Sequence, residues 1–143
     1  MTVPTIGRGF AFADLRVGFR FRTHRRTIRE ADLVAFMTLT GLTEELFSVK
    51  HEKQLVPGAL VYSLAEGLLL PSMQDTGIAF LGATLDITGP TYVDDTIHVE
   101  CEVLEHRLTS KGDRGLVRFS NSVVNQNGEA VLTYNPLRLL KKE

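Results

Sequence analysis

The sequence is poor in cysteine, in aromatic residues and in net charge. Its 143 residues include one cysteine, no tryptophan and five prolines, and the formal net charge at pH 7 is −1. A lone Cys101 excludes an internal disulfide and is typical of proteins from a reducing compartment. A charge so close to zero argues against a dedicated nucleic-acid binder, which usually carries a strongly basic face. We therefore expect a cytoplasmic protein without a nucleic-acid partner.

Long hydrophobic runs and targeting signals are also missing. The longest apolar-rich stretch, Leu55–Leu70, is shorter than the roughly 20 residues of a membrane span, and it contains Ser63 and Glu66. The segment Met1–Phe12 has no apolar run of the kind that a signal peptide needs. A composition of 43% hydrophobic and 23% charged residues is typical of a folded domain. We expect one domain over residues 1–143 and no membrane association.

The first part of the chain predicts a strand followed by a helix. Apolar and basic residues alternate over Gly18–Ile28, which is the period of a half-buried strand. Thr27 and Glu30 have the spacing of a capping box, in which both side chains satisfy free amides at a helix start. Apolar residues then recur at helical spacing until Gly41, a residue that commonly ends helices. We predict a helix over residues 28–40.

A second helix, from Pro57 to Pro71, is predicted to lie at the centre of the fold. A polar loop over residues 42–54 precedes it. Proline suits the first turn of a helix because its missing amide would have no partner there. Apolar residues then cover nearly every side of the helix, which is typical of a buried helix. The rest of the chain must therefore wrap around it.

The second half of the chain predicts strands alone. Candidate strands cover residues 78–88, 96–105, 115–125 and 130–140, and the pair Asn127-Gly128 is a strong hairpin signal between the last two. Such short connections favour an antiparallel meander. A curled antiparallel sheet wrapped around one central buried helix is the hot-dog fold, so the predicted fold class is α+β.

Three segments resemble the MaoC-like dehydratase family, which includes the (R)-specific enoyl-CoA hydratases. They are the first helix with Gly41, the run Leu55–Val61 and the run Gly89–Thr96, and the similarity spans residues 12–140. The resemblance implies an enoyl or hydroxyacyl thioester of CoA or of an acyl carrier as substrate, with no cofactor. It also implies a homodimer or higher homo-oligomer, with the site built between subunits.

The catalytic pair of that family is replaced in this sequence. The family signature places an Asp and a His that activate water, and Leu42 and Phe47 occupy the matching positions. Neither side chain can transfer a proton, which general acid–base catalysis requires. Glu44, Glu45 and His51 lie in the same segment and are candidate catalytic substitutes. The alternative is that these three residues are solvated loop charges.

The start of the second helix is the candidate substrate-binding site. Free amides at Val56, Gly58 and Ala59, together with the positive end of the helix dipole, suit a thioester oxygen or a developing enolate. Gly58 would let the ligand approach the backbone, or it would ease tight helix packing. Apolar side chains at Leu42 and Phe47 would line the same pocket.

Glu66, Arg25 and Arg26 carry further alternatives. Some hot-dog thioesterases resemble this layout, with Glu66 as the catalytic carboxylate and Gly58 polarising the carbonyl; the alternative is a structural carboxylate. Arg25 and Arg26 belong to a basic cluster that suits CoA phosphates or protects an edge strand. Its members are Arg16, Arg20, Arg22, Arg25, Arg26 and Arg29. The spacing of His and Cys residues predicts no metal site.

Three functions therefore stay open. The first is a MaoC-like hydratase or dehydratase whose acid–base pair is replaced. The second is a thioesterase that depends on Glu66. The third is a non-catalytic thioester-binding subunit of a hetero-oligomer with a catalytic hot-dog subunit, which the apolar Leu42 and Phe47 favour.

Overall fold

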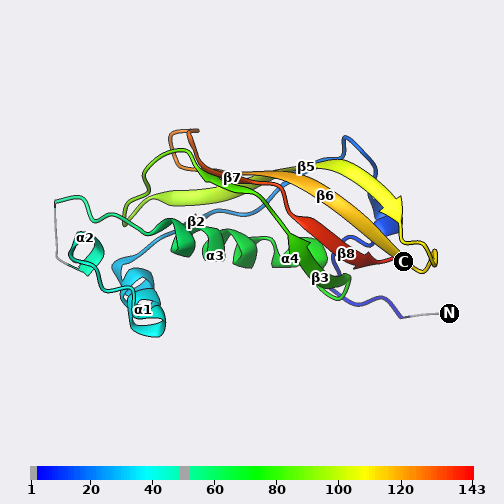
Figure 1. Ribbon diagram of the computed structural model, residues 1–143, viewed down its shortest axis with the longest axis horizontal. Helices are drawn as coiled ribbons and strands as arrows, with labels where there is room; N and C mark the ends of the chain where they lie inside the picture. The colour runs from blue at the N-terminus through cyan, green and yellow to red at the C-terminus, as the bar shows by residue number, and fades with distance from the viewer. Residues whose placement is uncertain (1–2, 49–51) are drawn as a thin grey trace.

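An antiparallel sheet with a long helix across one face forms the protein (Figure 1). The computed structural model describes residues 3–48 and 52–143. The helical elements are η1 (Phe12–Asp14), α1 (Glu30–Thr40), α2 (Glu45–Ser48), α3 (Gly58–Leu68) and α4 (Leu70–Met73). The strands are β1 (Arg20–Arg22), β2 (Arg26–Thr27), β3 (Gly77–Gly82), β4 (Leu85–Ile87), β5 (Thr96–Leu108), β6 (Arg114–Val124), β7 (Ala130–Tyr134) and β8 (Leu137–Lys141).

The eight strands form an antiparallel sheet that is five strands wide, because β1 with β2, β3 with β4, and β7 with β8 each occupy one strand position. Strand β5 pairs with β1 and β2 on one side and with β6 on the other. Strand β6 pairs with both β7 and β8, which in turn pair with β4 and β3. The hairpin succession β5–β6–β7 confirms the predicted meander. The strands at the two ends of the sheet, β1–β2 and β3–β4, both precede this meander in the chain.

Two predicted strands are interrupted, and the interruptions face each other. Residues 78–88 divide into β3 and β4, and residues 130–140 divide into β7 and β8. The Thr84 amide donates to the side-chain oxygen of Asn135 (2.7 Å), and the Asn135 amide donates to the Thr84 carbonyl (3.3 Å). Pro136 has no amide for the ladder. A side chain thus replaces regular strand pairing at this level of the sheet.

The start of the first helix differs from the prediction. The helix begins at Glu30, and the carboxylate of Asp32 accepts a hydrogen bond from the Arg29 amide (2.9 Å). The hydroxyl of Thr27 bonds instead to the hydroxyl of Thr96 across the sheet (2.7 Å). The predicted Thr27–Glu30 capping box is therefore wrong, because strand pairing with β5 takes Thr27. The predicted end is confirmed, since Gly41 has a φ of 76°.

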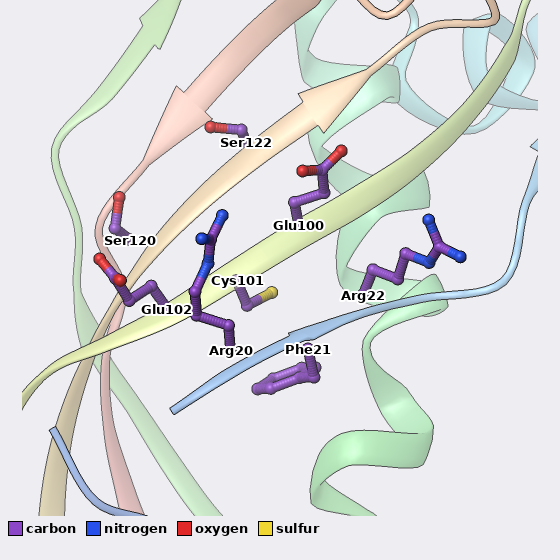
Figure 2. A pocket seen from close by; sticks show the side chains of 8 residues that line it. All are labelled: Arg20, Phe21, Arg22, Glu100, Cys101, Glu102, Ser120 and Ser122. Carbon is purple, nitrogen blue, oxygen red and sulfur yellow. The ribbon is translucent and has the colours of Figure 1, made fainter. Parts of the chain in front are cut away.

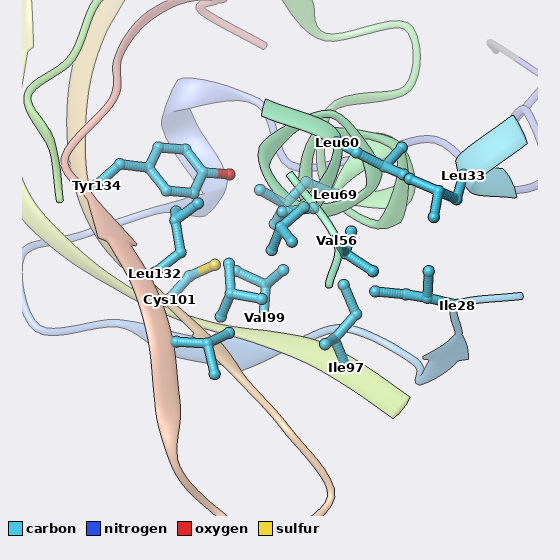
Figure 3. Close-up of a cluster of buried hydrophobic side chains, with 14 residues drawn as sticks. Ile28, Leu33, Val56, Leu60, Leu69, Ile97, Val99, Cys101, Leu132 and Tyr134 are labelled. Carbon is cyan, nitrogen blue, oxygen red and sulfur yellow. The ribbon is translucent and has the colours of Figure 1, made fainter. Parts of the chain in front are cut away.

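Helix α3 packs one side against the sheet and leaves the other side open. Leu60, Val61 and Ala65 are buried in the main core, and Figure 3 shows Leu60 with sheet residues such as Val99 and Leu132. Small residues on the opposite side are exposed, namely Ala59, Ser63 and Gly67. The prediction of a helix buried all round is therefore wrong for the single chain. Pro71 also does not stop the helical path, because it lies in the first turn of α4.

Residues 42–54 contain one short helix, α2, within the predicted polar loop. Figure 1 places α1 and α2 towards the start of α3, and α4 at its other end. None of the described helices combines the length and the apolar character that crossing a membrane requires.

Candidate functional site

Two backbone amides are open at the start of α3. The amides of Leu60 and Val61 both donate to the carbonyl of Pro57, at 3.0 and 3.2 Å. Among residues 3–48 and 52–143, no acceptor lies against the amides of Gly58 and Ala59. These two donors, at the positive end of the helix dipole, can stabilise an oxygen that gains negative charge.

The amide of Val56 does not belong to this set. It donates to the carbonyl of Thr91 (2.8 Å), next to a bridge between Leu55 and Tyr92. The prediction of a free amide at Val56 is therefore wrong, because the segment entering α3 pairs with the chain before β5. This pairing instead anchors the start of α3 to the sheet.

Gly58 allows close packing between α3 and β4. A Cβ atom added at Gly58 would lie 2.6 Å from Cδ1 of Ile87 and 3.3 Å from its Cγ1. The two roles predicted for Gly58, ligand access and tight helix packing, are compatible. The amide would serve the ligand, whereas the missing Cβ allows the packing. Any larger side chain at this position has to move either Ile87 or the two open amides.

Leu42 and Phe47 lie on the segment that reaches the start of α3. Both are half-buried. The amide of Leu42 donates to the Thr40 hydroxyl (3.2 Å), and the carbonyl of Phe47 accepts from the side-chain amide of Gln54. Gln54 precedes Gly58 by four residues, so this bond ties α2 to the approach to α3. The positions that match the family's Asp and His are therefore linked to the candidate site.

Of the three proposed catalytic substitutes, the structure describes Glu44 and Glu45. Glu44 and Glu45 are exposed to solvent at the start of α2. The carbonyl of Glu44 accepts a bond from the Phe47 amide (2.9 Å), which fixes the backbone and not the carboxylate. His51 lies outside the described residues. A catalytic role for the three remains a prediction.

Glu66 is held by three hydrogen bonds. Arg138 donates from Nη1 to Oε1 (2.9 Å) and from Nη2 to Oε2 (2.6 Å), and the Tyr134 hydroxyl donates to Oε2 (2.7 Å). The exposed fraction of the side chain is 7% for Arg138 and 25% for Glu66. Bidentate pairs of this kind are strong and geometrically specific. The arrangement favours a structural carboxylate over the catalytic carboxylate of a thioesterase.

Sequence reasoning missed Arg138 as the partner of Glu66. The sequence feature that could have revealed this pair is the position of Arg138 in the last strand. Arg138 lies on the same face of β8 as Leu140, and both residues are buried. A charge at such a position needs a partner. The sequence alone did not show that the partner lies 72 residues away on α3.

Two side chains near this ion pair stay protonated. Burial, and then the negative charge of Glu66, raise the pKa of Tyr134. Burial raises the pKa of the Cys101 thiol to about 12. Because the thiolate is the reactive form, Cys101 is an inert core residue at neutral pH.

Alkaline pH is expected to destabilise the protein through these groups. The ordinary pKa values are 9.0 for Cys101 and 10.0 for Tyr134, and folding raises both. The unfolded chain therefore loses these protons first, so the free energy of unfolding falls as the pH rises above each ordinary value. Urea unfolding at about pH 8 and about pH 11 measures the loss. In a Cys101→Ala variant the component that begins near pH 9 should disappear, and an unchanged profile would contradict this assignment.

The arginines of the basic cluster differ in their partners. Arg26 pairs with Asp32 (2.9 Å) and Arg29 pairs with Asp94 (2.9 Å). Arg25 is exposed and forms no ion pair with any described residue. Arg25 is therefore free to meet an anion, whereas the guanidinium of Arg26 is already engaged.

The arrangement of a helix across a five-row antiparallel sheet is the hot-dog fold, and solved structures bear this out. A monoamine oxidase regulatory protein from Archaeoglobus fulgidus is 28% identical, with a TM-score of 0.82 over 95% of this chain and 97% of its own. A putative MaoC domain dehydratase from Chloroflexus aurantiacus is 26% identical, with a TM-score of 0.90 over 99% of this chain and 43% of its own. An (R)-hydratase from Pseudomonas aeruginosa is 26% identical, with a TM-score of 0.76 over 94% and 88%.

A Mycobacterium tuberculosis protein described as having a double hot-dog fold is more distant in sequence. It is 19% identical, with a TM-score of 0.85 over 98% of this chain and 46% of its own. No family model and no curated protein matches the chain. The predicted hot-dog fold and the predicted resemblance to MaoC-like dehydratases and (R)-hydratases are confirmed.

Proposed function

We propose that this chain is a hydratase or dehydratase of the MaoC-like kind, acting on an enoyl or hydroxyacyl thioester. The observation that carries the proposal is the pair of open amides at Gly58 and Ala59. The likeness to an (R)-hydratase and to a putative MaoC domain dehydratase supports the same reaction class. Water adds to the double bond in the forward direction and leaves in the reverse direction.

The amides have a specific task in this reaction. Adding water to an enoyl thioester moves negative charge onto the carbonyl oxygen as the enolate forms. Donors aimed at that oxygen stabilise the charge without reorganising, and one such donor is commonly worth about 10²–10³ in rate. Gly58 and Ala59 supply two donors from one rigid helix start. The half-buried Leu42 and Phe47 would exclude bulk water from the acyl group.

The proton transfers need a side chain in place of the family's Asp and His. Glu44, Glu45 and His51 are the candidates that the chain offers in the matching segment. In a triple variant (Glu44→Gln, Glu45→Gln, His51→Ala), hydration should fall by about 10²-fold or more, because a general acid–base partner is lost. Enoyl-CoA consumption measures the effect, with Glu129→Gln, an exposed carboxylate on a turn, as control. Full activity in the triple variant would remove these residues from the mechanism.

A panel of enoyl-CoA and acyl-CoA esters separates the three functions. The absorbance of the conjugated double bond and the release of free thiol are followed together with the purified protein. We expect loss of the double bond without free thiol. Release of thiol that depends on Glu66 would identify a thioesterase and contradict the proposal.

A non-catalytic thioester-binding subunit is the second candidate. Apolar side chains at Leu42 and Phe47, and the solvent exposure of Glu44 and Glu45, favour it. In that case a second hot-dog subunit would bring the acid–base pair. Thioester binding without turnover by this chain alone, with turnover on addition of such a subunit, would identify this function.

We propose that a homodimer forms through the β3–β4 side of the sheet. In the described part of the chain, β3 pairs only with β8 and β4 only with β7, so the outer edge of both is open. Such an edge is a ready template for another chain. Exposed apolar residues gather on these strands, namely Ile78, Phe80, Leu81, Leu85 and Ile87. The double hot-dog neighbour supports a two-unit assembly.

A double variant tests this edge. Ile78→Asp with Leu81→Asp is expected to convert the dimer to a monomer, because two carboxylates per chain would be buried without partners. Light scattering measures the mass in solution. Leu104→Asp, at another exposed apolar position, is the matched control and should stay dimeric. A wild-type protein that is monomeric at all concentrations would contradict the proposal.

A further inference from the structure

One face of α3 carries the open amide of Gly58 and two polar side chains. Gly58, Tyr62 and Glu66 follow one another at intervals of four residues, which places them on the same face of the helix. They meet one side of the sheet, because Gly58 packs against Ile87 of β4 and Glu66 is bonded to Tyr134 of β7. Strands β4 and β7 are paired neighbours. These three residues, named here the α3 line, run from the candidate site to the Glu66 ion pair.

Tyr62 is the member of the α3 line with an available polar group. The residue is half-buried. Within the described ranges 3–48 and 52–143, no hydrogen bond engages its hydroxyl. The hydroxyl of Tyr134, by contrast, donates to Oε2 of Glu66 (2.7 Å). A tyrosine hydroxyl has one proton to donate, so the hydroxyl of Tyr62 can donate to a ligand.

The ring of Tyr62 is held by its neighbour on the sheet. It packs edge-on against the ring of Tyr134, with the ring centres 5.0 Å apart and the ring planes at 87°. Tyr134 is 3% exposed and bonded to Glu66, which Arg138 holds in turn. Edge-to-face packing of aromatic rings favours a defined geometry. The Glu66–Arg138 pair therefore positions Tyr62 indirectly, through Tyr134.

Helix geometry directs the side chain of Tyr62 towards the start of α3. Side chains of a helix lean towards its N-terminus, so each one covers the turn that precedes it. For Tyr62 that turn begins at Gly58, and four residues of helix span about 6 Å. A tyrosine side chain is of similar length. Its hydroxyl can therefore reach an oxygen that is bound at the amides of Gly58 and Ala59.

The charged side chains on the outer face of the sheet point away from this site. Figure 2 shows Glu100 and Glu102 projecting from one side of β5, and Cys101, which lies between them in the sequence, pointing to the other side. Cys101 belongs to the core beneath α3. Glu100 and Glu102 therefore lie across the sheet from the start of α3 and cannot act there.

Tyr62 is a neutral donor at physiological pH. Burial, and then the negative charge of Glu66, raise the pKa of its hydroxyl from the ordinary value of 10.0, against a smaller opposing effect of Arg138. The hydroxyl therefore keeps its proton in the pH range in which a thioester is stable. A neutral donor held by the fold suits an oxygen that gains negative charge.

We propose that the hydroxyl of Tyr62 is a third donor to the thioester carbonyl oxygen, beside the amides of Gly58 and Ala59. It shares the negative charge that develops on this oxygen as the enolate forms. The hydroxyl donates a hydrogen bond and transfers no proton in this step. The inference rests on the proposed function, and it adds a catalytic side chain to an oxygen site otherwise built from backbone.

Tyr62→Phe, which removes the hydroxyl alone, tests this role. We expect kcat for the hydration of crotonyl-CoA to fall by about 10²-fold with little change in KM, because one donor to the developing charge is lost. Urea unfolding should be unchanged, since the hydroxyl bonds to no described residue. Tyr92→Phe makes the same change at the other half-buried tyrosine and should leave kcat unaltered. An equal loss of kcat in both variants would overturn the inference.

A second measurement detects the donor without turnover. Butyryl-CoA is a saturated thioester to which water cannot be added, and its isotope-labelled carbonyl can be followed by infrared spectroscopy when bound. Hydrogen bonds to a carbonyl oxygen lower its stretching frequency. The band should therefore lie lower in the wild-type complex than in water, and Tyr62→Phe should lose part of this shift. The same band in both proteins would overturn the inference.

The two measurements separate this inference from the proposed function. A carbonyl band that depends on Tyr62, in a protein that hydrates no enoyl thioester, would support the inference and count against the proposed reaction. Hydration by Tyr62→Phe at the wild-type rate would overturn the inference alone. A wild-type protein that neither binds butyryl-CoA nor hydrates crotonyl-CoA would contradict both.

Discussion

Replacing Arg138 with Met is expected to lower the free energy of unfolding by roughly 3–5 kcal/mol. The substitution leaves the carboxylate of Glu66 without its two guanidinium bonds, in a side chain that is only 25% exposed. The Tyr134 hydroxyl is then its one described donor. An unpaired carboxylate of this kind is costly because it has lost its water without gaining a full set of partners. Urea unfolding measures the change.

A second variant shows whether the stability is lost because Glu66 lacks its charged partner or because the packing of the Arg138 side chain has changed. Glu66→Leu combined with Arg138→Met removes both charges, and it should recover most of the stability that the single substitution loses. The coupling between the two sites is read from a double-mutant cycle. If the single variant loses less than about 1 kcal/mol, the ion pair is not the structural element inferred from its geometry.

Gly58→Ala is expected to reduce turnover of an enoyl thioester by about 10²–10³-fold. The new Cβ would lie 2.6 Å from Cδ1 of Ile87, so either the side chain of Ile87 or the first turn of α3 has to shift. A shift of the first turn moves the amides of Gly58 and Ala59 away from the carbonyl oxygen. Steady-state hydration kinetics measure the loss, with kcat falling more than KM rises, because the donors act most strongly in the transition state.

Two further variants show whether the contact between the new Cβ and Ile87 causes the loss of turnover. Gly67→Ala lies on the same helix with no atom within 4 Å of its new Cβ, and it should remain active. Gly58→Ala combined with Ile87→Ala removes the obstructing atoms and should recover activity. Full turnover in the single Gly58→Ala variant would contradict the assignment of this helix start.

Local periodicity was enough to predict most of the secondary structure. The alternation along β5 and β6 and the apolar helix α3 are visible in the sequence because each pattern repeats within a few residues. The breaks in the strands were not predictable in the same way. They depend on the bonds between Thr84 and Asn135, which are 51 residues apart. The helix start at Glu30 likewise depends on Thr27 pairing across the sheet.

In the candidate site, too, features set by neighbouring residues were predictable from the sequence, and features set by distant residues were not. Open amides at Gly58 and Ala59 follow from the start of a helix, which the sequence marks with Pro57. The amide of Val56 is not open, because it donates to the carbonyl of Thr91, a residue far along the chain. The role of Glu66 depends on Arg138 in the last strand. Interactions between distant segments decided which predicted residues are free to meet a ligand.

The hydration of a trans-enoyl-CoA by the purified wild-type chain is the decisive test of the proposed hydratase function. The double-bond absorbance and the free thiol are recorded together, with Gly58→Ala and Gly67→Ala measured alongside. We expect the absorbance to fall without thiol release in the wild type and in Gly67→Ala, and we expect Gly58→Ala to be strongly impaired. An unchanged absorbance with the wild type, or a stoichiometric release of thiol, would contradict this function.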